Sequence, residues 1–164
     1  MGKRFSRSTD GEVDVEMVYA VLSGPDWAAQ RAVALGDHSE LVSRVETPDG
    51  GVSLVITRAV PAGGPGFLQK FLPSDPRATT TDIWGPSVDG VRRATWSVVL
   101  AGTPASVRGT ITIEPTPTGN RHTIDGEVRV PVPLIGGKAE SFIADQLVRL
   151  ADAEAGVVRQ VLNP

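Results

Sequence analysis

The sequence predicts a single α+β domain over residues 1–164, with a curved antiparallel sheet of about seven strands wrapped around one long C-terminal helix. Two patterns predict this arrangement. Between residues 39 and 130, short runs of alternating apolar and polar residues are separated by turns rich in glycine and proline, as in strands that bury one face. After Gly136-Gly137 the apolar spacing changes to three and four residues with no internal proline, which indicates a helix.

The N-terminal part predicts a strand followed by two short helices. Residues 5–9 read as the first strand. Thr9 or Asp10 can cap a helix over about residues 11–22, because a short oxygen side chain accepts the free amides of the first turn. Gly24-Pro25-Asp26 then ends this helix and starts the second short one.

The following strands are expected where apolar residues occupy every second position, so that each strand has one apolar face. Turn signals such as Pro48-Asp49-Gly50-Gly51 and Asp89-Gly90 separate them. The residues expected on the apolar faces include Leu41 and Val45; Val52, Leu54 and Ile56; Ala94, Trp96 and Val98; Val107, Ile111 and Ile113; and His122, Ile124 and Val128, with one more strand near residues 79–84.

The long helix is expected over about residues 138–162, which is roughly 37 Å and enough to cross the domain. Its apolar stripe consists of Ile143, Leu147, Leu150, Val157 and Val161. These spacings place one helix face against the sheet.

The order of these elements resembles the START-like (helix-grip) superfamily, which includes lipid-transfer domains, Bet v 1-type plant proteins and aromatic polyketide cyclases. Trp27 after the first helix and the segment Val130-Pro131-Val132-Pro133-Leu134-Ile135-Gly136-Gly137-Lys138-Ala139-Glu140 resemble, more narrowly, an uncharacterised actinobacterial family within it. The resemblance spans nearly the whole chain. It implies a cavity between the sheet and the long helix that binds an apolar small molecule, and it brings no shared catalytic motif.

Composition narrows the function classes. The chain has no cysteine and only two histidines, which excludes thiolate chemistry and multi-histidine metal sites, and we expect neither a metal nor a cofactor. The net charge of −3 argues against a nucleic-acid partner. No apolar run is long enough to cross a membrane, and residues 1–10 do not resemble a secretory signal. We therefore expect a cytoplasmic protein; the sequence leaves its oligomeric state open.

Glu154 is the most informative polar residue, because it lies in the middle of the apolar helix stripe and should face the sheet. A buried carboxylate needs a cation, hydrogen bonds or a proton. Arg58 shares the parity of Leu54 and Ile56 and is the candidate partner. Glu154 and Arg58 could jointly bind the polar head group of a ligand. Alternatively, Glu154 makes a structural ion pair or lies near a solvated helix end, and Arg58 lies beyond the end of its strand.

Three other residues lie on the expected apolar faces or at their ends. His122 could hydrogen-bond a ligand, or it could be a rim residue at the start of its strand. Trp84 and Trp96 could line the pocket and donate their indole N–H groups, or they could simply fill the core.

The connection from Pro61 to Pro73 combines glycines with Phe67 and Phe71 at one-turn helical spacing. It could form a lid over the pocket or an edge that touches a membrane or partner. It could equally be a short helix packed on the sheet edge.

These features leave three functions open. The first is a carrier or sensor of a lipid, isoprenoid or polyketide-like molecule, with Ile143, Leu147 and Leu150 in the pocket wall. The second is a cyclase- or hydrolase-type enzyme that uses Glu154, Arg58 and His122 in the same cavity. The third is a protein-interaction module with a filled core and an exposed apolar patch. The first is favoured, and no residue is assigned a catalytic role.

Overall fold

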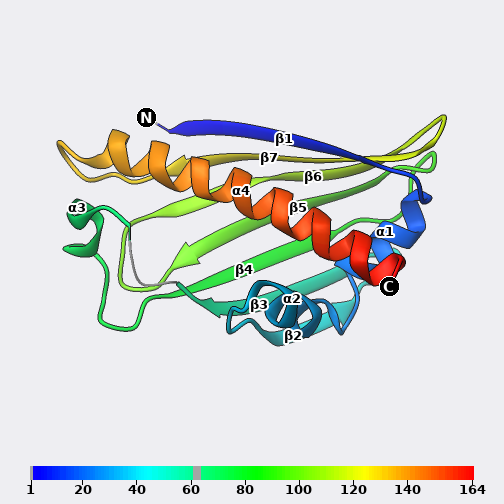
Figure 1. Cartoon of the computed structure of the whole chain (residues 1–164), viewed down its shortest axis with the longest axis horizontal. Coiled ribbons are helices and arrows are strands. Elements are labelled where there is room, and N and C mark those ends of the chain that lie inside the picture. Colours follow the sequence, from blue (N-terminus) through cyan, green and yellow to red (C-terminus); the bar gives the residue numbers. More distant parts are fainter. Residues whose placement is uncertain (1, 61–63) are drawn as a thin grey trace.

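A computed structural model describes residues 2–60 and 64–164. The long helix α4 lies diagonally across one face of a seven-stranded sheet (Figure 1), which confirms the predicted helix-grip α+β fold. Along the chain the elements are β1 (Lys3–Gly11), α1 (Val15–Leu22), α2 (Trp27–Leu35), β2 (Glu40–Glu46), β3 (Val52–Ala59), α3 (Gly66–Gln69), β4 (Arg77–Trp84), β5 (Arg92–Leu100), β6 (Ser106–Thr116), β7 (Gly119–Arg129) and α4 (Gly136–Leu162).

The sheet is antiparallel throughout, in the order β1-β7-β6-β5-β4-β3-β2. Consecutive strands from β2 to β7 are neighbours, and the N-terminal strand β1 completes the sheet beside β7. The helices α1 and α2 lie beside the C-terminal end of α4 (Figure 1). In the part of the chain that the structure describes, no helix is both long and apolar enough to cross a membrane.

Two glycines bring aromatic rings together on the face of the sheet that α4 covers. Phe5, Gly126, Gly109 and Trp96 are cross-strand neighbours in one row over four strands. A Cβ on Gly126 would lie 2.6 Å from the ring of Phe5, and one on Gly109 would lie 2.7 Å from Trp96 Nε1. The absence of side chains therefore lets the two rings pack edge to face, 6.1 Å apart. Trp96 Nε1 also donates to the carbonyl oxygen of Asp125 at 3.0 Å, which fixes the indole.

The predicted start of the first helix is wrong by four residues. Strand β1 continues to Gly11, which pairs with Asn120 of β7, so residues that could have capped a helix form sheet hydrogen bonds instead. Helix α1 begins at Val15, and Asp14 is its cap, since its Oδ1 accepts the N–H of Met17 at 2.9 Å.

The predicted apolar face of β2 is also wrong. A bulge between Leu41 and Ser43 shifts the register, and an extra residue in a strand reverses which side chains face the core. Arg44 consequently lies opposite the buried Leu54, and its Nε donates to the carbonyl oxygen of Ser23 at 2.7 Å. Val45 is 58% exposed.

Helix α4 begins two residues earlier than predicted, and two side-chain contacts connect it to β1 and to the segment after β7. Near its start, the buried Glu140 accepts the N–H of Val130 through Oε2 at 2.9 Å. Farther along, Asp152 forms an ion pair of 2.7 Å with Arg7 of β1. These contacts position the helix over the sheet.

Candidate functional site

A cavity of about 80 Å³ lies between the sheet, α2 and α4. Most of its wall is apolar and comes from three parts of the fold, including Trp27 of α2; Ile56, Trp96 and Ile111 of the sheet; and Leu147 and Leu150 of α4. Four ionisable side chains also line it: Arg31, Arg58, Asp82 and Glu154. The predicted cavity between sheet and helix is thus present, but it is small and four charged side chains line it.

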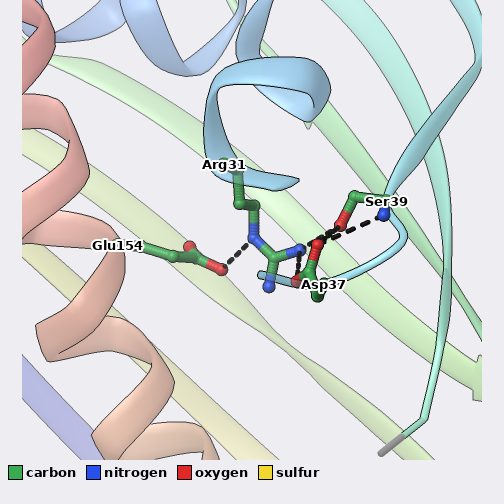
Figure 2. A network of polar contacts seen from close by, with 4 residues as sticks. All are labelled: Arg31, Asp37, Ser39 and Glu154. Carbon is green, nitrogen blue, oxygen red and sulfur yellow. Dashed lines mark hydrogen bonds and ion pairs between the residues drawn. The ribbon is translucent and has the colours of Figure 1, made fainter. Parts of the chain in front are cut away.

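Arg31 is the centre of a network that joins α2, the loop between α2 and β2, and α4 (Figure 2). Its Nε donates to Glu154 at 2.9 Å, and one terminal nitrogen donates to Asp37 at 2.9 Å and to Ser39 at 2.5 Å. Its side chain is only 4% exposed, whereas the carboxylates of Asp37 and Glu154 are 17% and 27% exposed. The guanidinium of Arg31 therefore has two carboxylate partners, Asp37 and Glu154.

The local sequence explains how the network assembles. Gly36 ends α2 in a left-handed conformation, with φ of 69°, which a residue without a Cβ adopts easily. The chain therefore turns sharply and brings Asp37 and Ser39 beside Arg31, one turn before the helix ends. Ser39 donates from both its N–H and its hydroxyl to Asp37 Oδ1. Glu154 faces inward as its helix position predicted, but its partner is Arg31 and not Arg58.

Arg58 projects from β3 into the same cavity without a partner. It shares the buried face of its strand with Leu54 and Ile56, as its parity predicted. Among residues 2–60 and 64–164, no group forms a hydrogen bond or ion pair with its guanidinium. Burial lowers the pKa of Arg58, and the nearby charge of Arg31 lowers it further, while Glu154 and Asp37 act in the opposite direction. The cation is therefore under-compensated by its surroundings.

Asp82 lies on β4 between Leu54 and Trp96 in the sheet. It lines the cavity, and no described residue hydrogen-bonds its carboxyl. Burial raises the pKa of Asp82 to about 7, with a further rise from Glu154 that Arg31 partly offsets. The carboxyl is therefore poised between its neutral and charged forms near neutral pH.

The register separates the two unpartnered groups. Asp82 pairs with Leu54, whereas Arg58 pairs with Ala78, so the two positions are four residues apart along the strands, or about 13 Å. Thr80 lies between them on the wall of the cavity. The cavity thus has a cationic end and an acidic end, with the pair Arg31–Glu154 beside them.

Five of the residues selected from the sequence line this cavity: Arg58, Trp96, Leu147, Leu150 and Glu154. The other five do not line it. Trp84 is buried beneath α1, where it packs edge to face against Tyr19 at 5.3 Å. Ile143 and Phe67 pack against the core, and Phe71 is 46% exposed. In the connection for which a lid and a short packed helix were both open, Pro61, Ala62 and Gly63 lie outside the described residues, and the short helix α3 follows them.

His122 lies outside the cavity, opposite Ile113 and Thr9 in the sheet. Its Nε2 is buried and has no hydrogen-bond partner among the described residues. Burial lowers the pKa of His122 to about 4, so the side chain is neutral near pH 7. It is not brought together with Arg58 and Glu154.

Sequence reasoning missed Arg31 and Asp82 as site residues. The signal for Asp82 was its parity with Thr80 and the buried Trp84, on a strand face that carries no other charge. The signal for Arg31 was its position four residues after Trp27, on one face of a short helix.

A second, wider hollow of about 690 Å³ lies on the sheet around Arg4, Arg108 and Glu127. It is largely open to solvent, and Arg4 and Glu127 already form an ion pair of 3.2 Å across it. The cavity between the sheet, α2 and α4 is the more enclosed of the two, so it is the better candidate site.

Residues 6–162 match the family described as "Protein of unknown function (DUF2505)". The chain belongs to this family. A relative from Mycobacterium tuberculosis (strain ATCC 25618 / H37Rv), described as an uncharacterized protein, is 30% identical over 162 residues, which cover 94% of this chain and 93% of the relative. This agrees with the uncharacterised actinobacterial family that the segment after β7 indicated.

Solved structures confirm the START-like fold. A START superfamily protein from Mycobacterium smegmatis superposes with a TM-score of 0.57 at 14% identity, over 96% of this chain and 98% of that one. Norcoclaurine synthase from Thalictrum flavum, solved in complex with dopamine and hydroxybenzaldehyde, superposes with a TM-score of 0.59 at 16% identity, over 99% and 87% of the two chains. At these identities the likeness concerns the fold alone.

Proposed function

We propose that the protein binds a small molecule with an apolar body and one polar group in the cavity between the sheet, α2 and α4, and that it acts as a carrier or sensor in the cytoplasm. The observation that carries this proposal is the composition of the cavity wall. Apolar side chains from the sheet, α2 and α4 surround a few charged groups, two of which, Arg58 and Asp82, have no partner among the described residues. Ligand sites in proteins combine these same two features.

The size of the cavity sets a condition on binding. About 80 Å³ is well below the roughly 300–1,000 Å³ of typical small-molecule sites. A lipid, isoprenoid or polyketide-like ligand therefore has to enlarge it. The contact between α2 and α4 is the natural place for this movement, because the ion pair Arg31–Glu154 crosses it and Glu154 retains access to solvent.

A second candidate is an enzyme of cyclase or hydrolase type, and Asp82 is the observation that favours it. A carboxyl group with a pKa of about 7 inside a cavity suits general acid–base catalysis near neutral pH. In this alternative, Asp82 takes the role first considered for Glu154 or His122. Replacement of Asp82 by asparagine would then abolish turnover and retain binding.

Native mass spectrometry of freshly purified protein tests the binding function. We expect a mass above that of the polypeptide, and extraction should give one class of apolar molecule. The variant Leu147→Trp should lose this extra mass, because a larger side chain in the wall fills a cavity of about 80 Å³.

The matched control is Val99→Trp, which adds the same bulk at a β5 position that is 57% exposed and should keep the bound molecule. A clean polypeptide mass for all three proteins, together with no uptake from a panel of lipids and polyketides, would contradict the proposal and favour an interaction module with a filled core.

A further inference from the structure

The charged groups of the cavity indicate what the polar group of the ligand is, provided that the proposed binding function holds. We propose that the ligand is a monocarboxylate with an apolar body and that Arg58 binds its carboxylate. Two arginines, Arg31 and Arg58, line the cavity. Arg31 already donates to Asp37, Ser39 and Glu154, whereas Arg58 donates to no described residue.

The buried guanidinium of Arg58 requires a negatively charged partner. A guanidinium has five N–H donors and no acceptor, so its partners must be oxygen or other acceptor atoms. Glu154 and Asp37 are near enough to be felt electrostatically, but they do not outweigh burial and the repulsion from Arg31, because the pKa of Arg58 is lowered. An anion in direct contact would compensate the cation, and a planar carboxylate matches the guanidinium in a two-point pair.

The acidic residues of the cavity limit the ligand to a single negative charge. Glu154 and Asp82 line the same cavity and both repel anions when ionised. A dianionic phosphate would face the same two carboxyl groups with twice the charge, and its desolvation would cost more than that of a carboxylate. One carboxylate at the Arg58 end leaves the apolar body to contact Ile56, Val98 and Leu150.

Octanoate and octan-1-ol form a matched pair of probes, because they share an eight-carbon chain and differ in the charged group. Binding can be followed by tryptophan fluorescence, since Trp27 and Trp96 line the cavity. We expect octanoate to bind more tightly than octan-1-ol to the wild-type protein. Arg58→Gln should weaken octanoate binding by about 10- to 100-fold, the range for the loss of a charge-assisted hydrogen bond, and should weaken octan-1-ol binding much less, because the hydroxyl group is uncharged.

Two further variants keep this test interpretable. Arg93→Gln removes an exposed arginine on β5 and should not change either affinity, which controls for the net charge of the protein. Arg58→Lys keeps the positive charge and should restore part of the octanoate affinity. Thermal unfolding should show that Arg58→Gln is folded, because it removes a buried cation that has no described partner.

The contradicting outcomes fall into two distinguishable groups. If octan-1-ol binds as tightly as octanoate, or if Arg58→Gln weakens both equally, the carboxylate assignment is wrong while the binding function stands. If neither probe binds to the wild-type protein and no ligand is found in the freshly purified protein, both proposals fail.

Discussion

Replacement of Asp82 by asparagine is expected to make the protein more stable than the wild type above about pH 7, by up to about 4 kcal/mol. The pKa of Asp82 is raised from 3.8 to about 7 in the folded protein, so the folded state holds a proton that the unfolded chain releases at lower pH. This contribution is fully present below the unfolded pKa and is lost as the pH rises through the folded pKa. At higher pH the wild type buries an ionised carboxylate, which asparagine replaces with a neutral amide.

Chemical denaturation at about pH 5 and about pH 8 measures this effect. The free energy of unfolding of Asp82→Asn, relative to wild type, should increase between the two values. His122 does not confuse the comparison, because it is present in both proteins and its pKa is about 4.

The control for Asp82→Asn is Asp152→Asn, which breaks the exposed ion pair with Arg7 and should change stability by less than about 1 kcal/mol at either pH. An Asp82→Asn variant that is less stable than wild type at pH 8, or a difference that does not vary with pH, would show that Asp82 is ionised and well solvated.

Replacement of Arg31 by leucine is expected to destabilise the protein by about 3 kcal/mol, at the lower end of the range for breaking a buried ion pair. The guanidinium is 4% exposed and holds both Asp37 and Glu154. Its removal leaves the carboxylates of Asp37 and Glu154 without this cation and breaks the ion pair between α2 and α4. The partial exposure of the two carboxylates lets water recover some of the lost interaction, and this is why the lower end applies.

Urea denaturation at neutral pH checks this expectation. Glu154→Gln is the matched control, because it leaves Arg31 bonded to Asp37 and Ser39 and should cost about 1 kcal/mol or less. Equal losses for the two variants would mean that the pair with Glu154, rather than the complete network, determines the stability of this region.

The fold was predictable because its signals are local and periodic. The alternation in the strands and the three- and four-residue spacing in the C-terminal helix reflect burial against one neighbouring layer. The errors arose where a contact distant in sequence outweighed a local preference. Pairing with β7 extended β1 through Asp10, and the bulge at Leu41 reversed the face of Val45.

The site was only partly predictable for a similar reason. The alternation along β3 predicted that Arg58 faces the core, and the helical spacing in α4 predicted that Glu154 faces the sheet. Both predictions were possible because each depends on the periodicity of one element. The partner of Glu154 depends on where α2 lies relative to α4, and no periodicity within either helix contains that information. Asp82 was missed because a single acidic residue in a threonine-rich strand is expected to be exposed to solvent. Its burial depends on the helices that cover the sheet, and the strand sequence does not contain their position.

The most direct test of the central claim, that this cavity binds a small molecule, is methyl NMR of isoleucine-labelled protein titrated with octanoate and with octan-1-ol. The methyl groups of Ile56, Ile111 and Ile124, which line the cavity, should shift in a saturable manner with at least one of the two probes. Ile83, which is 52% exposed, should not. Shifts confined to Ile83 and other surface residues, or no shifts with either probe, would contradict the account.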